Sequence, residues 1–495
     1  MYLGIDIGTS ATKTLIIDEA GNVKRFAISE YPLSTPRNGW AEQDPRLWWN
    51  AVLITIKETI SEIDAHEIKA IGLTGQMHGL VALDESDNVL RPAILWCDQR
   101  TAQQCEEITT TIGAERLIEL TANPALTGFT APKILWVRSN EPKVYEKIAK
   151  VMLPKDYIRY LLTGENASDV SDASGTGFFN VANRTWDSEV LSKLKIESKW
   201  LGKVYESPEI TGKITRGAAE LTGLPTGTPV IAGAGDNAAA AIGTGVARDG
   251  QAFVTIGSSG VVFAHTSKMR LDNKGRLHTF CAAVPGEWHI MGVTLAAGLS
   301  YKWFKENFAQ DISYAKLDEM ADAIPIGADN LLFLPYLNGE RSPHLDPDAR
   351  GAFIGLASTH EVGHLARSVM EGVAYSLRDC YDIILNMGIR SDEIIGCGGG
   401  MISKFWRQMV ADTFGVKVAT CQTSDGPALG AAMLAAVGSG AYASVPEICE
   451  SAIERVETIE PNLGAGKEYK RFHSIYKDLY SALQTTFGRL NTSEN

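Results

Sequence analysis

The chain has 495 residues, more than one hydrophobic core accommodates, because cores stop growing at roughly 250 to 300 residues. At least two domains with a cleft between them are therefore expected. With 45% hydrophobic and 21% charged residues, the composition excludes disordered, collagen-like and coiled-coil chains. The 46 basic and 59 acidic residues give a net charge of −13, whose field repels nucleic acids and anionic membranes.

The cysteines and the apolar segments indicate a cellular compartment. Seven cysteines, an odd number, are far apart and form no C-x-x-C pair, which disfavours a disulfide framework or a zinc site. The first residues lack a basic region and reach a carboxylate at Asp6, too early for a signal peptide. The longest charge-free run, residues 426–446, has two prolines and many small residues, unlike a membrane span. We therefore expect a protein of the reducing cytoplasm.

The first predicted element is a β-hairpin. Apolar side chains at every second position of residues 3–7 predict a strand, which is followed by a Gly-Thr-Ser turn at residues 8–10 and a second strand through residues 15–17. The same pattern recurs near the middle of the chain, where the strand 252–256 leads into the polar turn 257–260. An offset of about half the chain length favours a duplicated domain over a solenoid.

Strands and helices alternate elsewhere, which indicates α/β layering. Strands are expected at residues 70–73, 229–232 and 393–395, the second of them before an alanine-rich helix. A helix is expected over residues 403–414, ended by Gly415. The last helix should pack on the body through an amphipathic face made of Tyr469, Phe472, Ile475, Tyr476, Leu479, Tyr480 and Leu483.

The first turn has the composition of a phosphate-binding loop. Glycine lets backbone N–H groups approach an anion, while Thr9 and Ser10 add hydroxyl donors and Lys13 adds positive charge. Asp6 could hold Mg²⁺ through water, because this cation keeps several waters and takes one or two carboxylates. A single copy is better explained as an ordinary hairpin with a polar tip. Its recurrence at Ser258 indicates two turns that clamp a polyphosphate across a cleft.

The segment 233–238 (GAGDNA) allows three interpretations. It satisfies the G-x-G-x-x-A pattern of a dinucleotide-binding turn, and so an oxidoreductase must be considered. That pattern needs an acidic residue about 20 positions further on, and residues 252–263 contain none. Asp236 could instead cap the following helix, or it could accept a proton from a substrate hydroxyl as a general base. The segment alone favours the cap.

Other polar groups follow predicted strands, at the edge where α/β folds place ligands. His78 lies after the strand 70–73 and could bond a sugar hydroxyl, although a lone histidine is more often structural. The block 96–100 (WCDQR) mixes an aromatic face with polar tips, as sugar sites do, but a partly buried tryptophan with an ion pair is a serious alternative. The triple glycine 398–400 could lie flat against adenine or form a tight turn. There is no Walker A motif and no protein-kinase H-R-D loop.

Together these blocks resemble the FGGY carbohydrate kinases, and within that family the members that phosphorylate D-xylulose. The resemblance covers nearly the whole chain in order, through the blocks 4–10 (GIDIGTS), 75–79 (GQMHG), 128–133 (GFTAPK), 153–157 (LPKDY), 171–176 (SDASGT), 235–237 (GDN), 333–336 (FLPY), 339–341 (GER), 351–356 (GAFIGL), 398–400 (GGG) and 426–432 (GPALGAA). The first block occurs in many actin-like ATPases. The blocks 75–79 and 153–157 are much more specific.

The resemblance implies an α/β fold of two actin-like, ribonuclease H-like domains from a duplicated unit, which close around ATP-Mg²⁺ and a keto-sugar. Domain 1–247 would hold the sugar site and the first phosphate turn. Domain 248–495 would hold the second phosphate turn, the adenosine site and the C-terminal helix. The expected reaction is phosphorylation of D-xylulose to D-xylulose 5-phosphate in D-xylose catabolism, and a homodimer is suggested.

The resemblance also assigns residues. Asp236 would be the catalytic base and Asp6 the metal ligand. Met77, His78, Asp236 and Asn237 match the sugar-binding positions. Nucleotide-binding positions are matched by Thr9, Ser10 and Lys13 in the first turn, Ser258 in the second, and Gly298, Gly399 and Ser403. Cys97 stands where many of these kinases have asparagine, and a thiol is a poorer hydrogen-bonding group than an amide.

Three alternatives remain at this point. A kinase of the same family could act on ribulose, gluconate, a deoxy-sugar or glycerol. An actin-like ATPase serving as a chaperone or filament would need ATP but no sugar. An oxidoreductase would bind nicotinamide. Stimulation of ATP turnover by a sugar discriminates between the first two classes.

Overall fold

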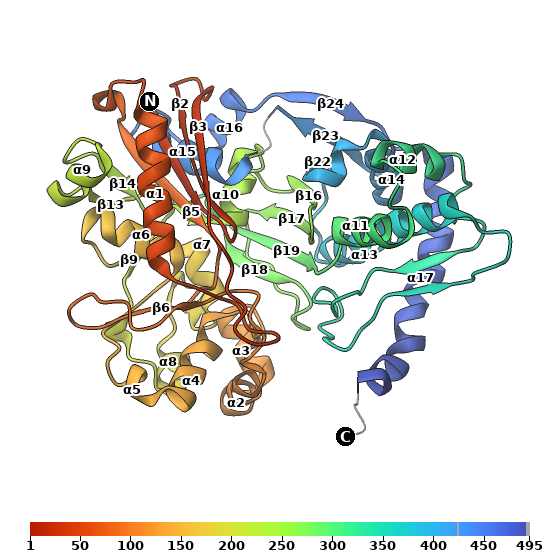
Figure 1. The fold of residues 1–495 in the computed structure, drawn as a ribbon, viewed down its shortest axis with the longest axis horizontal. Coiled ribbons are helices and arrows are strands. Elements are labelled where there is room, and N and C mark those ends of the chain that lie inside the picture. The colour runs from red at the N-terminus through yellow and green to blue at the C-terminus, as the bar shows by residue number, and fades with distance from the viewer. Residues whose placement is uncertain (423–424, 492–495) are drawn as a thin grey trace.

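The computed structural model describes residues 1–422 and 425–491, and each half of the chain is built on a seven-stranded sheet (Figure 1). The first sheet has the order β13-β14-β5-β1-β2-β3, with β15 paired to β5. Its strands are β1 (Tyr2–Ile7), β2 (Ala11–Ile17), β3 (Val23–Glu30), β5 (Ala70–Gly75), β13 (Ile210–Lys213), β14 (Pro229–Ile231) and β15 (Ala234–Gly235). The predicted first hairpin is thus confirmed.

The second sheet repeats this plan, with the order β18-β19-β17-β16-β22-β23-β24. Its strands are β16 (Ala252–Ile256), β17 (Gly260–Thr266), β18 (His278–Cys281), β19 (Trp288–Thr294), β22 (Glu393–Cys397), β23 (Lys417–Cys421) and β24 (Arg455–Ile459). In each sheet an antiparallel meander, β3-β2-β1 or β19-β17-β16, continues into two parallel strands and ends on an antiparallel edge strand. This repetition is the two-domain α/β, actin-like fold that was expected.

Helices cover both sheets. Those of the first half are α1 (Pro45–Ile60), α2 (Ala102–Ile112), α3 (Ala114–Thr121), α4 (Thr130–Asn140), α5 (Pro142–Tyr145), α6 (Pro154–Thr163), α7 (Val170–Ala173), α8 (Ser188–Leu194), α9 (Arg216–Thr222) and α10 (Asp236–Gly243). Those that follow are α11 (Gly298–Phe308), α12 (Tyr314–Asp322), α13 (Val362–Asn386), α14 (Lys404–Phe414), α15 (Gly426–Gly438), α16 (Val445–Ala452) and α17 (Leu463–Asn491). The predicted helix 403–414 corresponds to α14, which Ser403 caps and Gly415 ends.

Short elements connect these layers. Two-stranded pairs are formed by β4 (Glu42–Gln43) with β7 (Ala93–Ile94), β6 (Val81–Leu83) with β8 (Lys150–Met152), β9 (Ala167–Asp169) with β12 (Lys203–Tyr205), β10 (Phe179–Asn180) with β11 (Thr185–Trp186), and β20 (Leu332–Leu334) with β21 (Ala352–Ile354). Single 3-10 turns are η1 (Ala65–Glu67), η2 (Ser174–Thr176), η3 (Ser198–Trp200) and η4 (Gly399–Ile402).

Helix α15 belongs to the second half of the sequence but packs on the sheet of the first half, as Figure 1 shows. Two glycines make this possible: a β-carbon on Gly4 would lie 2.1 Å from the carbonyl oxygen of Ala428, and one on Gly72 would lie 2.0 Å from that of Ala431. Side chains at these positions would hold the helix away from the strands. The charge-free run that contains α15 is therefore apolar because the sheet and α10 bury it. No helix in the described residues is long and apolar enough to cross a membrane.

The other face of the first sheet packs on α1 and α6. Leu3, Ile5 and Ile7 are fully buried there, in one cluster with Trp48 and Ile158. Alternation along β1 then places Tyr2, Gly4 and Asp6 on the opposite face, toward α15. The side chain of Asp6 is thus directed to the side where the two halves meet.

Helix α17 runs along the outside of the second half in Figure 1, as the amphipathic pattern predicts, with one error. Tyr469, Phe472 and Tyr476 are buried in the main core of the second half, whereas Ile475 is 45% exposed. His473 takes its place: the side chain is buried and its Nε2 lies 2.7 Å from Oδ1 of Asp379 on α13. The buried face of α17 thus includes a polar pair that the hydrophobic pattern did not contain.

Candidate active site

Asp6 lies at the end of β1 in an environment that disfavours its charge. Its Oδ1 is buried and has no hydrogen-bond partner among the described residues. The same is true of Oγ1 of Thr74, its register partner on the parallel strand β5. Burial, and after it the negative charge of Asp236, raises the pKa of the Asp6 carboxyl to about 7. Two buried oxygens without protein donors on neighbouring strands are suited to bind a cation or an external hydrogen-bond donor.

Asp236 is the first residue of α10 and follows β15, which pairs with the end of β5. The N-cap position is occupied by Gly235, so the interpretation of Asp236 as a helix cap is wrong. One carboxylate oxygen accepts hydrogen bonds from the backbone N–H of Asn237 at 2.7 Å and from its side-chain amide at 2.9 Å. Burial raises the pKa of Asp236 to about 6 in spite of these two bonds. A carboxylate without an ion-pair partner is available to accept a proton.

The carboxylate of Asp236 opens into a cavity of about 590 Å³ between the two halves. The first half contributes Asp236 and Asn237, and the second half contributes the ends of its parallel strands, with Thr255 and Cys397. The cavity also reaches Gly398, Gly426 and Pro427 at the start of α15. Because this cavity is lined from both sides, a ligand in it would contact both halves.

A neighbouring cavity of about 670 Å³ brings together four of the predicted nucleotide residues, Ser258, Gly298, Gly399 and Ser403. Gly398 lines the first cavity and Gly399 the second, and Ile402 lines both. The two spaces are therefore contiguous along the triple-glycine segment. A long ligand could lie with one end beside Gly399 and the other beside Asp236.

Aromatic rings in this second cavity were not predicted. Trp406 and Tyr301 line it, and their rings meet edge-on at 5.4 Å between centroids. Each follows a predicted residue by three positions on a helix, Trp406 after Ser403 and Tyr301 after Gly298. Residues three apart lie on the same helix face, so the spacing was a signal that could have found them.

The first turn, residues 8–10, is stabilised by hydrogen bonds from side chains of the first half. Trp96 donates from Nε1 to Oγ1 of Thr9 at 2.9 Å, and Gln43 donates from Nε2 to the Thr9 carbonyl at 2.7 Å. Ser10 is exposed at the tip. Lys13 lies opposite Asp6 across the hairpin, and its Nζ is 2.9 Å from Oδ1 of Asp425. Of these three residues, Lys13 reaches the second half of the sequence through Asp425, and none of the three lines either of the two cavities described above.

Met77 and His78 follow β5, where the sequence placed them. A β-carbon on Gly235 would lie 2.9 Å from the sulfur of Met77, which places this side chain directly against the turn before Asp236. His78 has a φ of 67° and stacks on Phe129 with 4.7 Å between ring centroids. Its Nδ1 donates to the carbonyl of Gly175 at 2.7 Å, and burial lowers its pKa well below the usual value. The ring is therefore neutral, and Nε2 carries a lone pair that can accept a hydrogen bond.

Comparison with known proteins identifies the family. The model of the N-terminal domain of the FGGY family of carbohydrate kinases matches residues 1–243, and the model of its C-terminal domain matches residues 252–439. The chain belongs to the FGGY family of carbohydrate kinases. The predicted resemblance is thereby confirmed, and a non-sugar ATPase or an oxidoreductase is not supported.

Individual relatives cover the chain almost completely. The xylulose kinase of Bacillus subtilis (strain 168) is 39% identical over 481 residues, which are 97% of this chain and 96% of that protein. The xylulose kinase of Escherichia coli (strain K12) is 41% identical over 449 residues, 90% of this chain and 92% of that protein. The crystal structure of gluconate kinase from Lactobacillus acidophilus has a TM-score of 0.95 at 28% identity and covers 99% of both chains.

Packing explains the G-x-G segment in this FGGY kinase. A β-carbon on Gly233 would lie 2.0 Å from the carbonyl oxygen of Leu73 on β5. The N–H of Gly235 donates to Oγ of Ser171 at 3.0 Å and is not directed at a phosphate. Both glycines are thus required by the close approach of the turn to β5 and Met77.

The block 96–100 is largely structural. Asp98 is fully buried and pairs with Arg100, whose guanidinium lies 3.6 Å from the ring centroid of Trp40. Trp96 supports Thr9, as described above. Of the two interpretations left open by the sequence, the tryptophan beside an ion pair is the one that the contacts favour.

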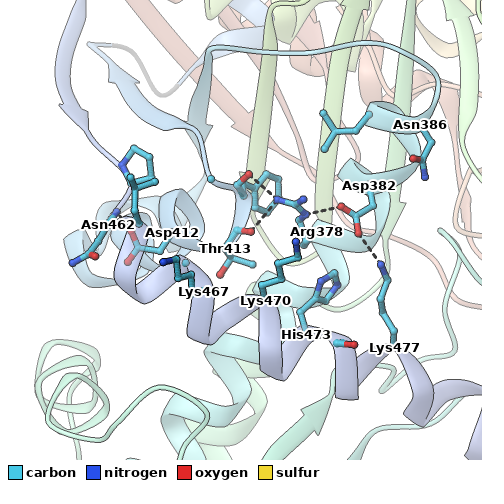
Figure 2. Close-up of a pocket in the computed structure, with 17 residues that line it drawn as sticks. Arg378, Asp382, Asn386, Asp412, Thr413, Asn462, Lys467, Lys470, His473 and Lys477 are labelled. Carbon is cyan, nitrogen blue, oxygen red and sulfur yellow. Dashed lines mark hydrogen bonds and ion pairs between the residues drawn. The ribbon is translucent and has the colours of Figure 1, made fainter.

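A third cavity, of about 810 Å³, lies away from these residues on the outer side of the second half, between α13, α14 and α17 (Figure 2). Two of its lining residues, Asp382 and His473, form with Asp379 the one group of three possible metal ligands found in the described residues. Asp382 is already paired with Arg378 at 2.7 Å and with Lys477 at 2.8 Å, as Figure 2 shows. Two cations satisfy this carboxylate, which leaves it less available to a metal ion.

Proposed function

We propose that the protein transfers the γ-phosphoryl group of ATP to D-xylulose and forms D-xylulose 5-phosphate. The observation that carries this proposal is the Asp236 carboxylate, which opens into the cavity between the halves and is hydrogen-bonded, among the described residues, only by the two N–H groups of Asn237. Full-length relatives at about 40% identity that are xylulose kinases support the choice of sugar.

Asp236 acts as the general base in this proposal. It accepts the proton of the sugar 5-hydroxyl while that oxygen attacks the γ-phosphorus, and ADP leaves on the opposite side. A pKa of about 6 keeps the carboxylate ionised at neutral pH and still basic enough to take the proton. Asn237 fixes the orientation of the carboxylate through its two hydrogen bonds.

The nucleotide is assigned to the two contiguous cavities. Adenine fits the 670 Å³ cavity, where Trp406 and Tyr301 offer aromatic surfaces and Gly399 offers flat backbone. The phosphates would then lie between Ser258 on the second turn and Thr9, Ser10 and Lys13 on the first. Hydroxyls and backbone N–H groups on facing turns bind such oxyanions without a Walker A loop.

The residues present fit a magnesium ion. Asp6 offers a buried carboxylate oxygen with no partner, and the repulsion between Asp6 and Asp236 is relieved by a divalent cation. One or two carboxylates with several waters are what Mg²⁺ prefers in phosphoryl-transfer sites. Bound there, the ion would neutralise charge on the phosphates, while Asp6 holds it and Lys13 adds a further positive charge.

The sugar is assigned to the space beside Asp236, Met77, His78 and Asn237. Nε2 of His78 accepts a hydrogen bond from a sugar hydroxyl, and the thioether of Met77 offers an apolar surface to the carbon chain.

The domain division stays a prediction: the N-terminal half 1–247 supplies the sugar site and the half 248–495 supplies the adenosine site. A homodimer and a cytoplasmic location also stay predictions. The second is supported by seven cysteines that form no disulfide.

A gluconate kinase is the second candidate, because the chain shares its fold with that of Lactobacillus acidophilus at a TM-score of 0.95. A panel of D-xylulose, D-ribulose, L-ribulose, L-xylulose, gluconate, glycerol and 1-deoxy-D-xylulose separates the candidates in a coupled assay of ADP release. D-Xylulose is expected to give the highest kcat/KM. If gluconate or another member does, the kinase chemistry stands and the sugar is wrong.

A further inference from the structure

Arg341 of the second half lies beside Gly128 of the first half, near the space assigned to the sugar. Arg341 lies in a loop after β20, and its guanidinium makes no hydrogen bond or ion pair with any residue that the structure describes. The side chain is partly buried, and burial lowers its pKa. None of its guanidinium nitrogens is fully enclosed by the described residues, so their donors are open to a ligand.

The place of this guanidinium is defined by Gly128. A β-carbon on Gly128 would lie 3.5 Å from Nη2 of Arg341 and 2.5 Å from the carbonyl oxygen of Trp96. Burial lowers the pKa values of His78, Lys133 and His278 and raises that of Cys97; the positive charge of Arg341 adds to the first three shifts and opposes the fourth, so all four groups lie near it. Arg341 therefore stands over the wall that His78 and Phe129 form.

This wall is rigid. Lys133 donates from Nζ to the carbonyl of His78 at 2.8 Å and to that of Gly128 at 2.7 Å, and Phe129 stacks on His78. Strand β18 of the second half closes the wall, with Phe280 at 6.2 Å from the rings of both Phe129 and His78. The described groups around Arg341 on this side are thus neutral rings and backbone, with Lys133 committed to two carbonyls.

The loop that carries Arg341 is anchored as firmly. One carboxylate oxygen of Glu340 accepts the backbone N–H groups of Leu295 and Arg341, both at 2.8 Å. Ser342 donates from its backbone to the carbonyl of Val293 at 2.9 Å and from Oγ to that of Arg276 at 2.8 Å. These bonds fix the backbone of the loop to the end of β19, so the Arg341 side chain starts from a fixed position before any ligand arrives.

We propose that Arg341 binds the hydroxyketone end of the sugar, donating two N–H groups of its fork to the C2 carbonyl oxygen and the C1 hydroxyl oxygen. This inference rests on the proposed phosphorylation at the 5-hydroxyl. With that hydroxyl at Asp236, the chain of the sugar extends past Met77 to His78, and its other end meets Arg341. Arg341 and Asp236 belong to different halves, so one bound sugar connects the two halves at both of its ends.

The contact predicts a specific change in discrimination. Arg341→Met keeps an apolar stem but removes every donor, and it is expected to lower kcat/KM for D-xylulose about 10- to 100-fold, mainly through KM. Wild type should prefer D-xylulose over 1-deoxy-D-xylulose, which lacks O1, and over xylitol, which lacks the carbonyl. In the variant both preferences should shrink by a similar factor, because the contacted oxygens no longer have a partner.

Controls separate this contact from a general effect on the fold. KM for ATP should stay within about twofold of wild type in Arg341→Met, and Arg216→Met, at an exposed position paired only with Glu220, should match wild type on all three sugars. Arg341→Lys keeps the charge without the fork and should lose the same discrimination. It is the variant to use if Arg341→Met does not fold.

The outcomes are distinct from those of the proposed function. If wild type does not phosphorylate D-xylulose, the proposed function is wrong. If wild type does and the Arg341 variants retain its full preference over both analogues, D-xylulose phosphorylation stands and the role of Arg341 is overturned. An equal loss on all three sugars also overturns the role, because it shows that Arg341 does not contact O1 or O2.

Discussion

The negative charge of Asp236 contributes to raising the pKa of the Asp6 carboxyl to about 7, after the larger effect of burial. Asp6 lies near the end of β1, Asp236 directly follows β15, and both strands are parallel to β5. The carboxyl ends of parallel strands lie at one edge of a sheet, so the two carboxylates come close together. The positive charge of Lys13 lowers the pKa of Asp6 by less than burial and Asp236 raise it, and no cation among the described residues lowers the pKa of Asp236. The site thus holds two acids that repel each other when both are ionised.

The pH dependence of turnover should report Asp236. At saturating Mg²⁺ and ATP, kcat/KM for the sugar should fall tenfold per pH unit below about pH 6, because the protonated carboxyl cannot accept the hydroxyl proton. The small residual activity of Asp236→Asn should show no such slope. An identical acidic slope in both proteins would assign it to another group.

Replacing Asp236 should stabilise the protein in alkaline solution. A carboxyl with a raised folded-state pKa binds a proton more tightly in the folded than in the unfolded state, so its contribution to stability is lost as the pH rises through the folded pKa. Asp236→Asn removes one such group and reduces the shift of Asp6. We expect about 1–2 kcal/mol more free energy of unfolding at pH 8 without Mg²⁺, and little difference at pH 4.5. Urea titrations at both pH values measure this, and a less stable variant at pH 8 would contradict it.

Asp6 should govern the requirement for magnesium. Asp6→Asn removes the charge but keeps the size of the side chain, and it should raise the Mg²⁺ concentration for half-maximal activity about tenfold or more, since one of one or two carboxylate ligands is lost. Asp311→Asn, at an exposed position, is the matched control. An unchanged Mg²⁺ titration would remove Asp6 from the metal site.

His78 should affect the sugar and not the nucleotide. Asn is the replacement of choice, because the φ of 67° at this position is better tolerated by Asn than by Ala. His78→Asn loses the acceptor at Nε2 and should raise KM for the sugar about tenfold while KM for ATP is unchanged. His66→Asn, at an exposed histidine, should behave as wild type. A parallel rise in both KM values would indicate a structural role for His78.

Gly399 tests the assignment of the nucleotide cavity. A β-carbon there would meet no atom within 4 Å, so Gly399→Ala should fold normally and yet place a methyl group on the cavity wall. We expect KM for ATP to rise about tenfold with the sugar KM unchanged. Gly217→Ala on α9 also meets no atom within 4 Å and lies outside the cavity, so it should leave both KM values unchanged. Normal ATP binding by Gly399→Ala would place adenosine elsewhere.

The repeated hairpins could be predicted because their signal is local. Alternating apolar residues around a Gly-Thr-Ser or Gly-Ser-Ser turn specify strand, turn and strand without knowledge of the rest of the chain. The return of α15 to the first sheet could not be predicted in this way. Its contact with Gly4, through Ala428, joins positions more than four hundred residues apart and has no periodic signature in either segment.

The residues of the site also divide into those with a local sequence signal and those without one. Asp236 and Ser258 follow predicted strands, so their placement at the edge of a sheet could be inferred. Arg341 could not be placed, because its loop is positioned by Glu340 and Ser342 against β19, and nothing in its sequence indicates that it faces Gly128. His473 was left out of the predicted buried face because a histidine that pairs with Asp379 carries no hydrophobic signal.

The most direct measurement is ADP release with ATP-Mg²⁺ and the sugar panel, for wild type, Asp236→Ala and the surface control Asp311→Ala. We expect D-xylulose to give the highest kcat/KM, Asp236→Ala to lose about 10²- to 10⁴-fold in turnover with its fold intact, and Asp311→Ala to match wild type. Folded Asp236→Ala with nearly full activity on D-xylulose would contradict the assignment of Asp236 as the base.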